Sequence, residues 1–219
     1  MIPLSFRVLA AACIAASCSA ALAQNLPGRY SVDGRNFDGS SYGGTLTIAA
    51  DGPVFRLTFA DGRTQRGMGI QRGNHLVAAF GPRDCIVAAM EKTADGGLRG
   101  AWGSLDRSAL GTETLQKQAG PAGQPDGTYD ATGRSPTGDT YEGVTTITPR
   151  GQTFRVVYKD GGSQQSGVAV TQGNVLGIAY GGPECVASVY AIGADGTLTG
   201  RWADPADTRV GQETVKRAR

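Results

Sequence analysis

Along short stretches of this chain, apolar and polar residues alternate with a period of two. Between residues 53 and 60, for example, Phe55, Leu57 and Phe59 are separated by polar side chains. Alternation of this kind is typical of a β-strand that buries one face and exposes the other. No stretch after residue 24 has the longer period of an amphipathic helix. The chain is therefore expected to be all-β.

The alternating stretches are separated by Asp-Gly, Gly-Asn and Gly-Pro pairs. Such pairs suit tight turns, because glycine reaches positive φ at little steric cost. Short turns favour an antiparallel meander, and a meander of about eight strands removes its exposed edges most simply by closing into a barrel. The alternative architecture is a β-sandwich. The strands expected in the first half lie near residues 28–34, 42–50, 53–60, 64–71, 75–80, 85–92, 97–103 and 111–117.

The second half of the chain repeats the first. The recurring features are Tyr42-x-Gly44 as Tyr141-x-Gly143, Cys85 as Cys185, Trp102 as Trp202, and Gly111-x-Glu113 as Gly211-x-Glu213. Residues 24–117 and 125–219 are therefore interpreted as two β-barrel repeats. Residues 118–124 lack apolar periodicity and are interpreted as the linker between them. Each repeat is expected to close its own barrel.

These motifs carry two resemblances. In strand count and meander order, each repeat resembles small barrels of the avidin and lipocalin type, whose signature residues are absent here. The Tyr-x-Gly strand and the Asp95-Gly96-x-Leu98-x-Gly100-x-Trp102 segment also resemble repeats of secreted bacterial proteins that are sometimes described as fibronectin-binding. The first resemblance implies a barrel with room for one small ligand. The second implies a secreted scaffold, because turn glycines and core aromatics identify a fold and not an activity.

The first 23 residues have the pattern of a secretory signal peptide. Arg7 precedes an apolar run, and Ala21-Leu22-Ala23 forms a small-x-small cleavage site. We therefore expect a secreted or periplasmic protein cleaved after Ala23. The alternative, a lipoprotein acylated on Cys18, is disfavoured because such cysteines usually follow a leucine that this sequence lacks. No later segment is apolar enough to span a bilayer as a helix.

Removal of the signal peptide leaves one cysteine in each repeat, at equivalent positions. A bridge within one repeat is then impossible, and an oxidising compartment favours disulfides. Cys85 and Cys185 are therefore a candidate disulfide between the repeats. The alternative is that both are small, buried free thiols.

Two glutamates are the candidate site residues. Glu113 and Glu213 each precede an apolar residue by two positions in the last strand of a repeat, so they are predicted to point into the barrel. A buried carboxylate needs hydrogen-bond donors. It either closes the barrel structurally or orients a ligand at a cavity mouth. The candidate donors are the hydroxyls of Tyr30 and Tyr129, on the adjoining first strand, and the indoles of Trp102 and Trp202.

Charge and chemistry argue against several classes of function. The formal net charge is +2 and the basic residues are scattered, so neither nucleic acid nor an anionic membrane is an expected partner. His75 is the sole histidine, which argues against a histidine-based metal cluster or a repeated histidine-dependent active site. We therefore expect no cofactor and no enzymatic activity.

Two classes of function remain. The first is a non-catalytic interaction module that binds a protein or glycan through barrel surfaces or loops. It is favoured because the inward aromatic and leucine side chains are numerous enough to fill an eight-stranded interior. The second is a carrier of small hydrophobic ligands with one pocket in each barrel, for which Gly44, Ala78 and Gly100 would leave room.

Overall fold

The computed structural model describes residues 25–218, and its regular structure consists entirely of β-strands. The signal-peptide prediction and the Cys18 alternative lie outside the described residues. The strands are β1 (Gly28–Arg35), β2 (Ser41–Asp51), β3 (Val54–Ala60), β4 (Thr64–Arg72), β5 (His75–Phe80), β6 (Ile86–Lys92), β7 (Leu98–Ser104), β8 (Gly111–Ala119), β9 (Gly127–Arg134), β10 (Thr140–Arg150), β11 (Thr153–Lys159), β12 (Gln164–Gln172), β13 (Val175–Tyr180), β14 (Val186–Ile192), β15 (Leu198–Ala203) and β16 (Gly211–Arg217). The strands predicted for the first half match β1 to β8 closely.

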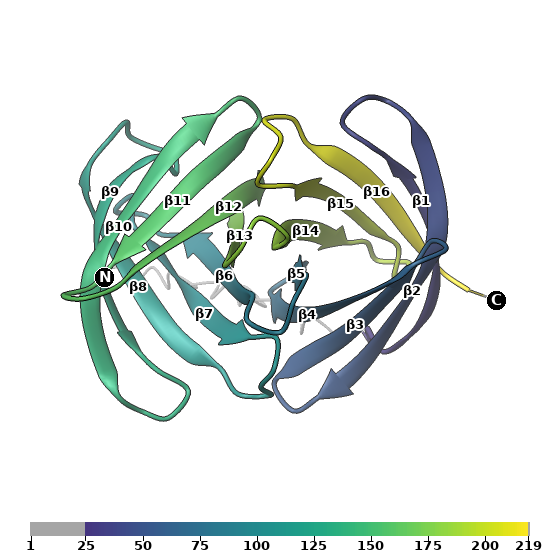
Figure 1. The fold of residues 1–219 in the computed structure, drawn as a ribbon, viewed down its shortest axis with the longest axis horizontal. Helices are drawn as coiled ribbons and strands as arrows, with labels where there is room; N and C mark the ends of the chain where they lie inside the picture. Colours follow the sequence, from purple (N-terminus) through teal and green to yellow (C-terminus); the bar gives the residue numbers. More distant parts are fainter. Residues whose placement is uncertain (1–24, 219) are drawn as a thin grey trace, which may run out of the picture.

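The strands form two closed antiparallel barrels of eight strands each, as predicted from the sequence. The first, here called barrel A, contains β1 to β5 together with β14 to β16, whereas barrel B contains β6 to β13. Figure 1 shows them side by side, with barrel B in teal and green only and barrel A in colours from both ends of the chain. Barrel B is therefore one continuous segment of chain, inserted between β5 and β14 of barrel A.

The prediction that each repeat closes its own barrel is wrong. Each barrel takes five strands from one repeat and three from the other. β5 pairs with β14 and β13 pairs with β6. The two repeats are similar in sequence, so β14 can offer β5 the same complementary edge as β6. Residues 118–124 do not separate the barrels, because residues 118 and 119 end β8 and β8 pairs directly with β9. The equivalent junction in barrel A is the pairing of β1 with β16, the first and last strands of the described residues.

The chain passes between the barrels at residues 81–85 and 181–185, which are equivalent in the two repeats. Cys85 and Cys185 form a disulfide there, with Cα atoms 5.7 Å apart. Gly81 has a φ of +149°, and a Cβ on it would lie 2.7 Å from both the Cys85 Sγ and the Glu184 carbonyl oxygen. Only glycine fits this close approach. The candidate disulfide thus links the two crossing segments.

Three apolar clusters hold the molecule together. One fills barrel A, one fills barrel B, and the third lies between them on the outer faces of β4 to β7 and β12 to β15. Within β5, Leu76 and Ala78 belong to the barrel A interior, whereas Val77 and Ala79 belong to the cluster between the barrels. Strands next to the second barrel are therefore buried on both faces, which differs from the half-buried strands expected from alternation.

Candidate functional site

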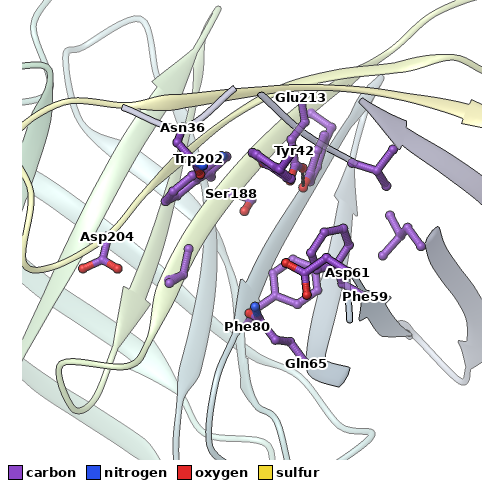
Figure 2. Close-up of a pocket in the computed structure, with 14 residues that line it drawn as sticks. Asn36, Tyr42, Phe59, Asp61, Gln65, Phe80, Ser188, Trp202, Asp204 and Glu213 are labelled. Atoms are coloured by element: carbon purple, nitrogen blue, oxygen red, sulfur yellow. Dashed lines mark hydrogen bonds between the residues drawn. The ribbon is translucent and has the colours of Figure 1, made fainter. Parts of the chain in front are cut away.

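Each barrel has a cavity at one of its mouths. The cavity of barrel A has a volume of about 320 Å³ and that of barrel B about 200 Å³. Every residue lining the barrel B cavity has its repeat equivalent in the lining of the barrel A cavity. Figure 2 shows Tyr42 and Glu213 next to each other on one side of the barrel A cavity, with Phe59, Asp61 and Gln65 on the other side. The two mouths are versions of one site.

In barrel A the site is built on one row of residues that crosses five neighbouring strands. Glu213 of β16 is paired with Gly34 of β1 on one side and with Gly200 of β15 on the other. Tyr42 of β2 pairs with Gly34, and Tyr190 of β14 pairs with Gly200. Because the glycines have no side chains, both tyrosines reach over them to the glutamate. The Tyr42 hydroxyl donates to Glu213 Oε1 at 2.5 Å, and the Tyr190 hydroxyl donates to Oε2.

Barrel B repeats this row with one substitution. Glu113 of β8 lies between Gly133 of β9 and Gly100 of β7, and Tyr141 of β10 reaches over Gly133. The Tyr141 hydroxyl donates to Glu113 Oε1 at 3.2 Å. The position of the second tyrosine is occupied by Met90, which is paired with Gly100. Glu113 therefore has fewer tyrosine donors than its counterpart in barrel A.

Burial changes the ionisation of both glutamates. Glu113 is only 8% exposed, and this desolvation raises its pKa from 4.5 to about 7, against the lowering effect of the Tyr141 hydrogen bond. Desolvation also raises the pKa of Glu213, and the hydrogen bonds from Tyr190 and Tyr42 oppose it. The same desolvation, together with the neighbouring carboxylate, raises the pKa of the Tyr42 hydroxyl well above its ordinary range. At neutral pH these hydroxyls are donors, and the Glu113 carboxyl is partly protonated.

Aromatic rings form the walls beside the glutamates. In barrel B the Trp102 indole N–H donates to the Tyr141 hydroxyl at 2.7 Å, so a chain of hydrogen bonds leads from the indole to Glu113. In barrel A Trp202 contacts Tyr42 edge to face, with ring centroids 6.5 Å apart. The indole nitrogen of Trp202 is buried and has no hydrogen-bond partner within residues 25–218, although it lies near enough to Tyr42 to lower the pKa of that hydroxyl.

The rim of barrel A carries an additional ring. Phe37, between β1 and β2, lies 5.0 Å from Trp202 by ring centroids, and the Arg209 guanidinium lies over the Phe37 ring at 5.6 Å from its centroid. Arg209 also pairs with Asp207 at 2.9 Å. The residue equivalent to Phe37 in barrel B is Pro136. The two mouths therefore share their inner residues and differ at the rim.

Glu113 and Glu213 each line a cavity, but two of the predicted donors lie elsewhere. The Tyr30 hydroxyl donates to the Leu26 carbonyl oxygen at 2.6 Å, and the Tyr129 hydroxyl donates to the Pro125 carbonyl oxygen at the same distance. Tyr30 lies on β1 and Tyr129 on β9, each is bonded to the segment that precedes its strand, and neither lines a cavity. Each tyrosine is on a strand next to the glutamate's strand, as predicted, but at a different level along the barrel axis.

The donors that sequence reasoning missed are Tyr42, Tyr141 and Tyr190. The repeated Tyr-x-Gly motif was visible, and so were the glycines that face it, Gly34 and Gly133. When a glycine lies on the strand between a tyrosine and a glutamate, the tyrosine ring can pass over the glycine and reach the carboxylate. This pattern would have indicated the tyrosines as donors. Trp102 and Trp202 line the cavities, but among the hydrogen bonds of the described residues neither indole donates to a glutamate.

The space expected over Gly44 and Gly100 is occupied. A Cβ on Gly44 would lie 3.0 Å from the Phe59 ring, and one on Gly100 would lie 2.8 Å from Met90 Sδ. The space over these glycines is therefore filled by the backbone and side chains of neighbouring strands. Apolar residues fill the body of each barrel, and the cavities lie at the mouths, where the glutamates are.

Comparisons with models of protein families, with curated proteins and with solved structures find no match to this chain. Within residues 25–218, no group of three or more histidine, cysteine, aspartate or glutamate side chains is placed to hold a metal ion. Nor does that part of the chain contain a helix with the length and apolarity to cross a membrane. Fold and site define an all-β protein of two closed barrels, each with a carboxylate and aromatic rings around the cavity at its mouth.

Proposed function

We propose that this protein binds small organic molecules, one in the mouth of each barrel. The observation that carries the proposal is a solvent-open cavity in each barrel, lined by convergent tyrosine and tryptophan side chains and by a glutamate that is buried in barrel B and half-buried in barrel A. Small-molecule sites are typically concave, with apolar and aromatic walls and a few placed polar groups. The larger cavity, at about 320 Å³, is near the lower end of the usual range of roughly 300–1,000 Å³.

The cavities favour this class over a module that binds a protein or glycan through barrel exteriors or loops, which stays a prediction. They also change the expected ligand from a purely hydrophobic one, because carboxylates line both cavities. The resemblance to barrels of the avidin and lipocalin type supports a ligand held inside the barrel. No catalytic step is part of the proposal.

The proposed place of action is outside the cytoplasm. The signal-peptide pattern ending at Ala23 supports export. The disulfide between Cys85 and Cys185 supports an oxidising compartment, secreted or periplasmic.

Tryptophan fluorescence tests the binding function. The chain has two tryptophans, and one lies in each mouth. A panel of small aromatic and aliphatic compounds, neutral and charged, is titrated into the whole protein and into the Trp102→Phe and Trp202→Phe variants. At least one compound is expected to give a saturable change from each remaining tryptophan. No saturable change across the panel, confirmed by calorimetry, would overturn the proposal.

Mouth-filling variants locate the site. Ser188→Phe puts a ring into the barrel A cavity, and Ala88→Phe does so at the equivalent position of barrel B. Each variant is expected to abolish binding in its own barrel and to preserve it in the other, which serves as the internal control. Binding that survives both substitutions would place the ligand somewhere other than the mouths.

A further inference from the structure

The charged side chains that line the two cavities have one sign, and Arg209, at the rim of barrel A, is paired with Asp207. The barrel A cavity is lined by the carboxylates of Glu213, Asp61 and Asp204, and the barrel B cavity by those of Glu113 and Asp160. Among the described residues that line either cavity, there is no lysine, arginine or histidine. A cleft lined by one sign of charge focuses its field on the bound ligand. This favours a positively charged ligand and repels an anion.

The glutamates lie inside the mouths and the aspartates lie on the rims. Glu113 is buried, whereas Asp61 and Asp160 are exposed ends of turns. Hydrogen bonds from Ser163 and Gly162 lower the pKa of Asp160, so the rim of barrel B holds a full negative charge at neutral pH. A cation entering barrel B therefore passes an ionised rim before it reaches the buried carboxyl.

The walls suit the same ligand class. Tyr42 contacts Phe59 in a T-shaped arrangement with centroids 6.3 Å apart, and Tyr141 contacts Tyr158 in the same way at 6.2 Å. Aromatic faces attract ammonium groups, and the attraction increases when the cation leaves water. Rings and carboxylates together give an organic cation both an apolar surface and a counter-ion.

A neutral or anionic ligand fits the cavities less well for an energetic reason. Any ligand that fills a mouth removes water from its glutamate, which is already poorly solvated. Burial of a carboxylate without compensation is costly. An ammonium group compensates it with a charge-assisted hydrogen bond, whereas an alcohol compensates it only weakly and a carboxylate repels it.

We infer that both mouths take organic cations, namely small amines with an aryl or alkyl group, with the ammonium directed at Glu213 in barrel A and at Glu113 in barrel B. The inference rests on the proposed binding function and names the ligand class of the same sites. The apolar part of the amine lies against the tryptophan and tyrosine rings that line each mouth.

Three probes of one shape and different charge test the inference. Phenethylamine, phenethyl alcohol and hydrocinnamate are titrated into the whole protein by calorimetry at about pH 8, where the amine is protonated and the acid is ionised. The amine is expected to bind more than about tenfold tighter than the alcohol, and the acid is expected not to bind. Equal affinities for amine and alcohol would overturn the cation inference and leave the binding function standing. Absence of binding by every compound, in this series and in the broader panel, would overturn both.

Matched variants separate charge recognition from a structural role. Glu213→Gln and Glu113→Gln are each expected to weaken amine binding in their own barrel by more than about tenfold and to leave alcohol binding unchanged. Glu142→Gln is the control, because Glu142 is exposed on β10 beside Tyr141. Near-ultraviolet circular dichroism checks that each variant is folded. Equal loss of amine and alcohol binding in a folded glutamine variant would assign the glutamate to structure alone and overturn the inference.

Discussion

The Tyr42 hydroxyl reaches Glu213 across the backbone of Gly34, at 2.5 Å from Oε1. Tyr42 lies on β2, Gly34 on β1 and Glu213 on β16, so the hydrogen bond crosses β1 where the first and last described strands pair. The sequence left two roles open for Glu213, closure of the barrel and orientation of a ligand. The geometry is compatible with both, because the hydrogen bond links the strands next to β1 and also fixes a carboxylate at the cavity wall.

Gly34→Ala is expected to disturb this contact and destabilise the protein. A Cβ at Gly34 would lie 2.2 Å from the Tyr42 ring, so the ring has to move away from Glu213. Forcing extra volume into a packed site typically costs about 1–3 kcal/mol. Urea unfolding measures the loss, and the same substitution is expected to weaken ligand binding in barrel A.

The control for this prediction is Gly43→Ala, next to Tyr42 on the same strand. A Cβ there would meet only the Val32 carbonyl oxygen, at 3.5 Å, and the position is exposed. Alanine in place of glycine at an unstrained site is neutral or slightly stabilising. If Gly34→Ala is as stable as Gly43→Ala, the position of the Tyr42 ring does not require glycine at residue 34.

The stability of the protein is expected to fall as the pH rises from about 5 to about 7. The folded-state pKa of Glu113 is raised from 4.5 to about 7, so the folded protein holds this proton more tightly than the unfolded chain does. Protonation therefore favours folding, and the contribution is complete below pH 4.5 and is lost as the pH passes about 7. It amounts to roughly 3 kcal/mol at 1.36 kcal/mol per unit of pKa.

Urea unfolding at several pH values, with the disulfide intact, measures this slope. Glu113→Gln cannot ionise and is expected to flatten most of it, whereas Glu142→Gln is expected to keep it. The raised pKa of Glu213 adds to the slope in the same direction, which explains any remainder in Glu113→Gln. An unchanged slope in Glu113→Gln would mean that its carboxyl is better solvated than the geometry indicates.

The pKa values of the two glutamates are expected to depend on whether a second tyrosine donates to the carboxylate. Tyr190→Phe removes the donor to Glu213 Oε2, so the pKa of Glu213 is expected to rise further and the stability to fall by about 1–3 kcal/mol. Met90→Tyr adds a hydroxyl at the equivalent position of barrel B, so the pKa of Glu113 is expected to fall. Carboxyl carbon shifts followed by NMR titration measure both pKa values. Unmoved values in both folded variants would contradict the assigned hydrogen-bond pattern.

Strand positions followed from the sequence because alternation and turn glycines are local signals. The stretch 53–60, for instance, appears as Val54–Ala60. Strand partners did not follow, because the similar repeats make β6 and β14 equivalent candidates for β5. The continuous apolar run Val175–Tyr180 was a signal that had not been used: it indicates burial on both faces, hence a second layer outside the barrel.

For the site, the sequence indicated the direction of the glutamate side chains but not their hydrogen-bond partners. Parity along a strand gave the inward direction of Glu113 and Glu213, since side chains alternate between the faces. The level of a residue along the barrel axis depends on the register between neighbouring strands. Hairpin turns did not fix the register between β1 and β16, because no turn connects these two strands. The expected partner Tyr30 therefore lies at a different level from Glu213, whose observed partner is Tyr42.

Loss of the disulfide is expected to destabilise the protein by about 4–5 kcal/mol on the chain-entropy model, because Cys85 and Cys185 are 100 residues apart. The paired variant Cys85→Ser with Cys185→Ser is compared with the oxidised protein by urea unfolding. Addition of a reductant to the paired variant is the control and is expected to change nothing. A paired variant as stable as the oxidised protein would mean that the cluster between the barrels holds the crossing segments without the bond.

A chain reduced to residues 86–180 is expected to fold by itself as an eight-stranded barrel. This segment contains β6 to β13, and the pairing of β13 with β6 closes the barrel without any strand from outside it. It also contains the whole cavity of barrel B, so its single tryptophan, Trp102, reports binding in that mouth. Far-ultraviolet circular dichroism and a cooperative thermal transition measure the fold.

The same segment is expected to self-associate. Without barrel A, the outward side chains of Val87, Val168 and Val170, which belong to the cluster between the barrels, face water. Apolar patches of this kind drive association in isolated domains. Sedimentation at increasing concentration measures it, and Val168→Ser with Val170→Ser is expected to restore a monomer that keeps its barrel. A segment that stays unfolded in both forms would show that barrel B depends on the strands of barrel A, and the inserted arrangement would then not be two separately stable barrels.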